Sequence, residues 1–106
     1  MSDEILNQLF EIIEGRKDAD PKTSYVAALY TKGTAKIAQK VGEEAVETCI
    51  EAIQGDKQKV AEESADLLFH LMVLWADAGL TPNDITEILK SRLGTSGHDE
   101  KASRKN

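Results

Sequence analysis

Apolar residues recur every three or four positions along most of the chain, and no segment alternates apolar and polar residues as a half-buried strand would. The pattern predicts a first helix from about Ser2, its expected cap, to Glu14, and Gly15 ends it. The polar stretch "RKDADPKTS" then reads as a linker. The apolar stripe of this first helix consists of Ile5, Leu9, Ile12 and Ile13.

Capping residues and glycines divide the next part of the chain into two helices. Ser24 is expected to cap the short helix "YVAALYTK", which Gly33 ends. Thr34 is expected to cap a longer helix that reaches about Gln54 and is ended by Gly55.

Two more helices follow by the same signals. Asp56 is expected to cap a helix that reaches about Ala78. Thr81, followed by Pro82 at the first helical position, begins a last helix that Gly94 ends.

These segments indicate an all-α protein, a compact antiparallel bundle of about five helices completed by dimerisation. One domain is expected over residues 1–94, because the chain is long enough for a single core. Residues 95–106 are polar and carry no apolar stripe, so we expect a disordered tail.

The third helix carries two kinds of face when residues are placed about 100° apart. One sector is apolar and predicts a core stripe in which Cys49 is a small buried residue. Its members are Val46, Cys49, Ile50 and Ile53. The neighbouring sector is charged and holds Lys36, Lys40, Glu43, Glu44, Glu47 and Glu51.

The fourth helix is apolar most of the way round, which predicts that it is largely buried, with Trp75 in the core. One narrow polar strip remains, and acids in partly buried places need partners. The strip holds Lys59, Glu62, Glu63, Asp66, His70 and Asp77, with Val73 among them.

A tight connection at Gly55 makes the third and fourth helices an antiparallel hairpin. Residues equally far from the turn then lie side by side, so we expect Glu44 beside Asp66 and Glu47 beside Glu63. Four facing carboxylates require either raised pKa values or bound hard cations. Oxygen ligands of this kind suit Mg²⁺, with Mn²⁺ as a possible substitute, and such a site acts naturally on nucleotide phosphates.

Several neighbouring side chains allow both a structural and a functional interpretation. Lys36 and Lys40 either decorate the helix surface or hold phosphate oxygens. His70, one turn beyond Asp66, fits a hydrogen-bonded structural histidine better than a ligand. Ser24 and Tyr25 could touch a substrate, although capping explains Ser24.

Composition excludes several classes of protein. The net charge of −6 argues against a general nucleic-acid surface. A single cysteine excludes a disulfide framework and a cysteine-based zinc site. The start "MSDEILNQLF" is not a signal peptide, and the longest apolar stretch, "LLFHLMVLWA", is too short for a membrane span. We therefore expect a cytoplasmic protein.

The stretches "SYVAALYTKGTAKIAQKVGEEAVETCIEA" and "EESADLLFHLMVLWADAGL" closely resemble the phosphoribosyl-ATP pyrophosphohydrolase family. This family belongs to the all-α nucleoside triphosphate pyrophosphohydrolases, and the similarity covers roughly residues 4–93. The acidic pattern of the superfamily stands here as "EEAVE" from Glu43 and "ESAD" from Glu63.

The resemblance implies Mg²⁺-dependent hydrolysis of 1-(5-phosphoribosyl)-ATP to the AMP derivative and pyrophosphate, the second step of histidine biosynthesis. It implies a homodimer or a higher homo-oligomer. Lys36 and Lys40 would hold phosphates, and Glu43 is the candidate for orienting or deprotonating the attacking water. The implied metal ligands are Glu44, Glu47, Glu63 and Asp66.

Three other functions compete with this one. A housekeeping pyrophosphohydrolase of the same superfamily, acting on nucleoside triphosphates, would carry the same acids. A redox di-iron bundle needs Glu-x-x-His pairs, which neither His70 nor His98 provides. A non-catalytic helical interaction module would show no stabilisation by Mg²⁺.

Overall fold

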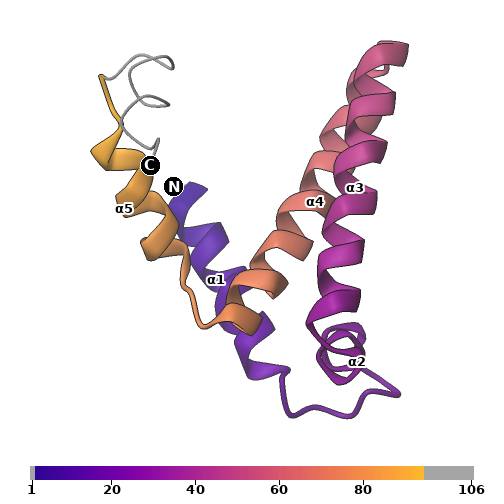
Figure 1. The fold of residues 1–106 in the computed structure, drawn as a ribbon, viewed down its shortest axis with the longest axis vertical. Helices are drawn as coiled ribbons and strands as arrows, with labels where there is room; N and C mark the ends of the chain where they lie inside the picture. Colours follow the sequence, from indigo (N-terminus) through magenta and orange to yellow (C-terminus); the bar gives the residue numbers. More distant parts are fainter. Residues whose placement is uncertain (1, 95–106) are drawn as a thin grey trace.

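The structure is a computed structural model that describes the backbone of residues 2–94 and side chains from residue 4 onward. Within that range the chain forms five helices and no strand, which confirms the all-α prediction. The expected tail at residues 95–106 lies outside the described residues. The helices, shown in Figure 1, are α1 (Ser2–Gly15), α2 (Tyr25–Lys32), α3 (Thr34–Gln54), α4 (Lys57–Ala78) and α5 (Pro82–Ser91).

Three of the predicted caps are confirmed. The Ser24 hydroxyl accepts a hydrogen bond from the backbone N–H of Ala27 at 3.1 Å, at the start of α2. Asp56 accepts one from Lys59 in the same way, at the start of α4. Thr81 forms a reciprocal capping box with the residue three positions later, at the start of α5. Caps are local interactions, so the sequence predicts them well.

Three helix ends differ from the expectation, and the first is the end of α1, which includes Gly15. Thr34 is the first residue of α3 and not its cap, because Gly33 occupies the cap position with φ 96° and ψ 174°. A residue with a side chain rarely adopts that positive φ. The Thr34 hydroxyl instead donates to Asp77 Oδ2 at 2.7 Å. The last helix, α5, ends at Ser91, three residues before the predicted Gly94.

The two longest helices, α3 and α4, form an antiparallel hairpin, whereas α1 and α5 form a second arm that diverges from it (Figure 1). Gly55 makes the turn in the left-handed region, at φ 79° and ψ 19°. Its N–H donates to the Ala52 carbonyl, and the next N–H donates to the Glu51 carbonyl. These bonds close the end of α3 tightly, so α4 begins beside it.

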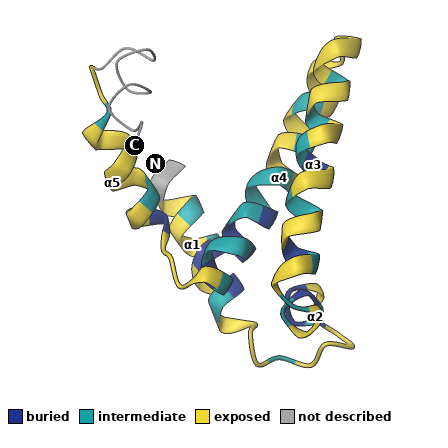
Figure 2. Ribbon diagram, viewed as in Figure 1, coloured by how far each residue is buried: buried dark blue, intermediate teal, exposed yellow. Residues whose placement is uncertain are grey.

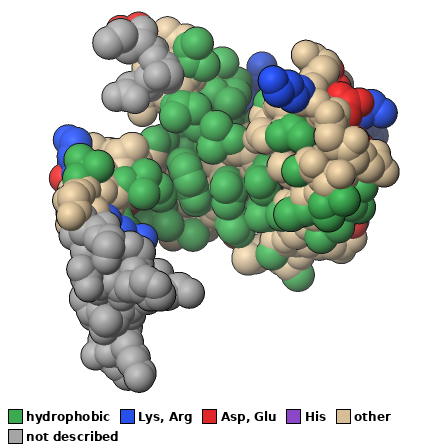
Figure 3. Space-filling model, turned by 90° about the horizontal axis from the view of Figure 1, so that it is seen from above, with side chains coloured by type: hydrophobic (Ala, Val, Ile, Leu, Met, Phe, Trp, Pro, Cys, Tyr) green, Lys and Arg blue, Asp and Glu red, His purple; other side chains and the backbone are tan. Residues whose placement is uncertain are grey.

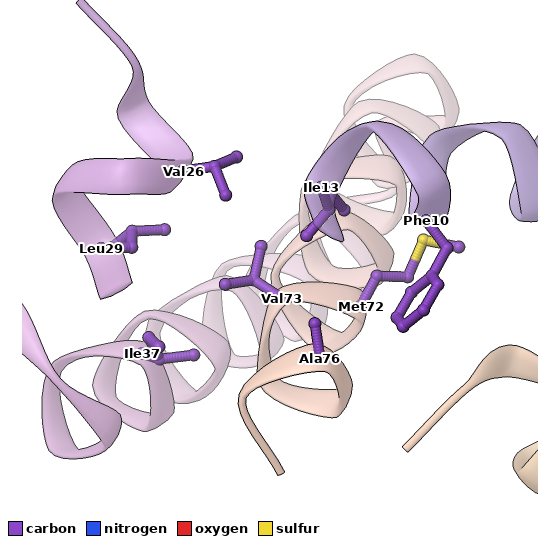
Figure 4. Packing of buried hydrophobic residues seen from close by; sticks show 8 residues of the cluster. All are labelled: Phe10, Ile13, Val26, Leu29, Ile37, Met72, Val73 and Ala76. Carbon is purple, nitrogen blue, oxygen red and sulfur yellow. The ribbon is translucent and has the colours of Figure 1, made fainter. Parts of the chain in front are cut away.

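The core lies where α1, α2, the start of α3 and the end of α4 meet, and most of the hairpin beyond it is exposed (Figure 2). Side chains from these four helices point toward one another in Figure 4. Val73, which the sequence places on the polar strip of α4, is fully buried here. The buried cluster consists of Phe10, Ile13, Val26, Leu29, Ile37, Met72, Val73 and Ala76.

The prediction of a core stripe on α3 is wrong. Val46, Ile50 and Ile53 are 58%, 46% and 86% exposed, and Cys49 is exposed as well. The helix instead turns the face that carries Ile37 and Glu44 inward, and both of these residues are buried. An apolar stripe therefore runs along the outside of the hairpin.

The fourth helix is buried only in its second half, so the prediction that it is largely buried is wrong for its first half. Its buried residues begin at His70, and Ala61 and Ala65 are exposed although they are apolar. Trp75 is partly buried and packs against the core. Among the described residues, no helix has the length and apolar character needed to cross a membrane.

Candidate metal centre between α3 and α4

Three carboxylates from the two helices of the hairpin meet at one level. Glu44 projects from α3, and Glu63 and Asp66 project from α4 one turn apart. One oxygen of each lies within 4.8 Å of the corresponding oxygens of the other two. Glu44 and Asp66 are thus brought together, as equal distance from the turn predicts, and Glu63 joins them.

The cluster leaves carboxylate oxygens without partners. Oε2 of Glu44 and Oε2 of Glu63 are buried and accept no hydrogen bond from any residue that the structure describes. Glu44 as a whole is only 8% exposed. Buried oxygens of this kind are costly unless a hydrogen bond or a cation reaches them. The donor set therefore fits a hard divalent cation such as Mg²⁺.

The pKa shifts of the clustered acids also indicate a place for a cation. Burial raises the pKa of Glu44, and the negative charges of Glu47 and Asp66 raise it further. Burial also raises the pKa of Glu63, to which Glu47, Glu44 and Asp66 contribute in the same sense. The acids are therefore held closer together than their mutual repulsion favours, and a cation between them would relieve that repulsion.

Glu47 lies at the edge of this cluster. Its carboxylate is not among the three that approach within 4.8 Å, and its side chain is exposed, as is that of Asp66. Its charge nevertheless acts on both Glu44 and Glu63. The charge of Glu47 is the first of the neighbouring charges that raise the pKa of Glu63, so the predicted pairing of Glu47 with Glu63 stays a prediction beside the observed group of three.

Glu43 and the two lysines line the same side of α3. Lys40 Nζ lies 3.3 Å from Glu43 Oε1, and Gln39 donates a hydrogen bond to the other oxygen at 2.8 Å. These two hydrogen bonds lower the pKa of Glu43, and the charge of Lys36 lowers it further. Glu43 is therefore an ionised, exposed carboxylate beside the cluster, and a cationic side chain stands next to it.

Next to the acids, an aromatic pair joins α2 to α4. The Tyr25 hydroxyl lies 2.7 Å from His70 Nε2, and His70 Nδ1 lies 2.8 Å from the backbone carbonyl of Asp66. His70 is buried and hydrogen-bonded, the structural role that the sequence favours for it. Its partner is not predictable from the sequence, because 45 positions separate the two residues.

An open hollow of about 440 Å³ lies along α3 beside the acids. Gly42 and Val46 give it apolar walls, and Glu43 and Glu47 border it. The acidic side of α3 and its exposed apolar stripe therefore meet in one depression of the surface.

Comparisons with known proteins show the family of the chain. A phosphoribosyl-ATP pyrophosphatase of Azospirillum brasilense is 63% identical over 95% of this chain and 91% of its own length. The enzyme of the same name from Rhizorhabdus wittichii is 60% identical, over 93% of each chain. One from Zymomonas mobilis is 51% identical over 98% of this chain and 97% of its own. The sequence pattern of phosphoribosyl-ATP pyrophosphohydrolase matches residues 6–93, and the chain therefore belongs to that family of enzymes.

Proposed function

We propose that this chain hydrolyses 1-(5-phosphoribosyl)-ATP to 1-(5-phosphoribosyl)-AMP and pyrophosphate, the second step of histidine biosynthesis, in the cytoplasm. The observation that carries the proposal is the carboxylate cluster of Glu44, Glu63 and Asp66, with two buried oxygens that lack partners. In a chain of this family, such a cluster is the natural place for the ion that a polyphosphate substrate requires.

Mg²⁺ is the proposed cofactor, with Mn²⁺ as a substitute. Glu44, Glu63 and Asp66 would hold it, and Glu47 would complete the ligand set from the exposed edge. When bound, the ion would neutralise negative charge on the phosphate oxygens. The phosphate chain would meet the protein through the cation and the neighbouring lysines.

The lysines and Glu43 have separate proposed roles. Lys40, and Lys36 one turn before it, would hold phosphate oxygens by charge-assisted hydrogen bonds. Glu43 would orient a water molecule or accept its proton, and the water oxygen bonds to the α-phosphorus as the bond to the leaving pyrophosphate breaks. The lowered pKa of Glu43 favours its ionised form, which can accept a proton from the water.

The exposed apolar stripe on α3 supports a proposal about assembly. Val46, Ile50 and Ile53 leave a contiguous apolar face in water, which a lone chain of this size would not favour. We infer that a second copy of the chain covers it in a homodimer or a higher homo-oligomer. Because the hollow at Val46 is bordered by Glu43 and Glu47, the partner would also wall the proposed site.

The direct test is pyrophosphate release from phosphoribosyl-ATP, set against ATP and dATP, with Mg²⁺ and with EDTA. We expect rapid release from phosphoribosyl-ATP only when Mg²⁺ is present. Faster turnover of ATP or dATP would favour the housekeeping pyrophosphohydrolase instead. If no substrate is hydrolysed and Mg²⁺ leaves thermal stability unchanged, a non-catalytic interaction module is the better description.

A further inference from the structure

Tyr25 lies at the surface, and contacts with Phe69 and His70 hold its side chain. Its residue is 52% exposed, yet its ring stacks on Phe69 at a centroid distance of 6.2 Å. Its ring also meets the edge of His70 at 5.7 Å, with the two planes 87° apart. With the hydroxyl bonded to His70 as well, the side chain is fixed in one orientation before any ligand arrives.

The hydrogen-bond chain determines which way the Tyr25 hydroxyl points. A backbone carbonyl can only accept, so His70 Nδ1 must donate its hydrogen to Asp66 O. A neutral imidazole that donates from Nδ1 has a bare Nε2, so the Tyr25 hydroxyl donates to it at 2.7 Å. The only hydrogen of the hydroxyl is then engaged, and its oxygen can offer nothing but lone pairs to a ligand.

The surroundings place this oxygen at the proposed site. The Tyr25 hydroxyl bonds to His70, whose other ring nitrogen bonds to the backbone carbonyl of Asp66, so the hydroxyl lies close to one of the proposed metal ligands. The charges of Lys40, Glu44, Glu43 and Asp66 also act on Tyr25. Burial raises the pKa of Tyr25, which keeps the hydroxyl protonated at neutral pH. A ligand at the carboxylate cluster would therefore have this fixed acceptor beside it.

The chemistry of a nucleotide narrows what Tyr25 can bind. Phosphate oxygens are acceptors and gain nothing from a second acceptor. Sugar hydroxyls are donors, and the adenosine ribose is attached directly to the α-phosphate. We propose that Tyr25 accepts a hydrogen bond from a hydroxyl of that ribose and so determines substrate specificity, while His70 is the positioning residue that orients it. This inference rests on the proposed function, and it adds a contact with the sugar.

The kinetic test compares phosphoribosyl-ATP with its 2′-deoxy and 3′-deoxy forms in the adenosine ribose. For the unmodified protein, we expect one deoxy form to have a KM about three- to tenfold higher than that of phosphoribosyl-ATP, because it lacks one neutral hydrogen bond. Tyr25→Phe should raise the KM of the parent substrate by a similar factor and remove the discrimination, with kcat within about twofold. If Tyr25→Phe raises the KM of all three substrates by the same factor, so that the discrimination remains, the inference is overturned.

Tyr30→Phe is the matched control on the same helix. Its hydroxyl is buried without a hydrogen-bond partner among the described residues, and its ring lies 5.4 Å from Lys17 Nζ. Burial raises its pKa, and the charges that raise it further are those of Glu14 and Asp77, which are not members of the carboxylate cluster. Removing an unpartnered hydroxyl should leave the discrimination between ribose and deoxyribose intact. If Tyr30→Phe erases it as well, the effect is a general disturbance of α2, and the specific role of Tyr25 is contradicted.

Two further readouts do not depend on turnover. In ¹⁵N NMR at pH 8, His70 should carry its proton on Nδ1, and Tyr25→Phe should move the Nε2 resonance alone. A proton on Nε2 would overturn the inference.

The second readout is binding. Titration of the protein with AMP, 2′-deoxy-AMP and 3′-deoxy-AMP in Mg²⁺ should show the same discrimination in Kd. If it does while hydrolysis fails, the proposed reaction is wrong and the Tyr25 contact stands; equal binding of all three contradicts the contact alone.

Discussion

Glu44 is the residue on which the proposed chemistry depends most. It is a charged side chain that the fold buries, in a chain whose other acids are mostly exposed, and one of its oxygens has no partner among the described residues. An arrangement of this kind costs stability in the folded protein. Such a cost is typical of a functional site, where the geometry that binds a ligand differs from the geometry that is most stable without it.

We expect Glu44→Gln to stabilise the metal-free protein and to abolish its response to Mg²⁺. The amide removes a buried negative charge and can donate to the neighbouring carboxylates. Relief of one like-charge pair, at about 0.5 kcal/mol, should raise Tm by roughly 2–4 °C in EDTA. Thermal melts with and without Mg²⁺, together with pyrophosphate release, check this; kcat should fall about 100-fold or more.

Glu11→Gln is the matched control, because Glu11 is an exposed carboxylate on α1. It should leave Tm, the Mg²⁺ response and turnover close to those of the unmodified protein. Near-normal turnover by Glu44→Gln at saturating Mg²⁺ would contradict the ligand assignment.

The stability of the metal-free protein should fall as pH rises above the ordinary glutamate value of 4.5, because the pKa values of Glu44 and Glu63 are raised. In that window the unfolded chain ionises these groups before the folded protein does, so the unfolded state binds fewer protons. Melts in EDTA between pH 4.5 and 7.5 measure the slope. Other groups also titrate there, so the comparison is with Glu44→Gln, whose slope should be smaller; equal slopes would contradict the assignment.

The meeting of Glu44 with Asp66 could be predicted from the sequence, since it needs only the position of the turn and the antiparallel hairpin. The contact between Tyr25 and His70 could not, because it depends on how α2 docks against α4. That docking is fixed by the core around Val26 and Leu29, and no local pattern encodes it.

At the scale of helices, local signals located the elements well. Caps and glycines act within one turn, so the bounds of α2 and α4 agree with those expected, and α3 begins one residue earlier than expected. The inward face of α3 was predicted wrongly, because periodicity shows that an apolar stripe exists but not what covers it. The stripe of Val46, Ile50 and Ile53 faces outward, and the site face that carries Glu44 faces α4.

The cap of α4 provides a prediction at this scale. Asp56→Ala removes the carboxylate that accepts from Lys59, next to the turn that sets the alignment of α3 with α4. We expect a loss of about 1 kcal/mol and a Tm lower by roughly 4–8 °C. Denaturation monitored by circular dichroism measures it.

Gln58→Ala is the control for the cap. Within residues 4–94, the side chain of Gln58 bonds only Glu62 on the surface of the same helix, and alanine is a good helix former. Its Tm should change by no more than about 2 °C. A similar loss in both variants would show that the effect belongs to the exposed start of α4 and not to the cap.

As a whole, the chain is two diverging arms joined at one small core (Figure 1). Seen from above, hydrophobic side chains gather on the surface between the arms (Figure 3). Exposed apolar residues also lie on α1 and α5, among them Ile12, Ile88 and Leu89. A molecule that leaves so much apolar surface in water is expected to bury it against copies of itself.

Ile50→Glu tests the proposed dimer. A charge in the centre of the α3 stripe would be buried twice across a symmetric interface, so we expect the dimer to weaken about 100-fold or more. Sedimentation velocity over a range of concentrations measures the shift toward monomer. Gln58→Glu adds the same charge to α4 away from the stripe and should leave the assembly unchanged. Equal behaviour of both variants would argue against this face as the interface.

The central claim is that Glu44, Glu63 and Asp66 hold a divalent cation between α3 and α4. Anomalous diffraction from crystals soaked in Mn²⁺ tests it most directly, because it locates the ion without reference to activity. The account predicts a peak at bonding distance from carboxylates of both helices, absent in Glu44→Gln. No peak there in fully soaked crystals, or a site elsewhere that survives this substitution, would contradict it.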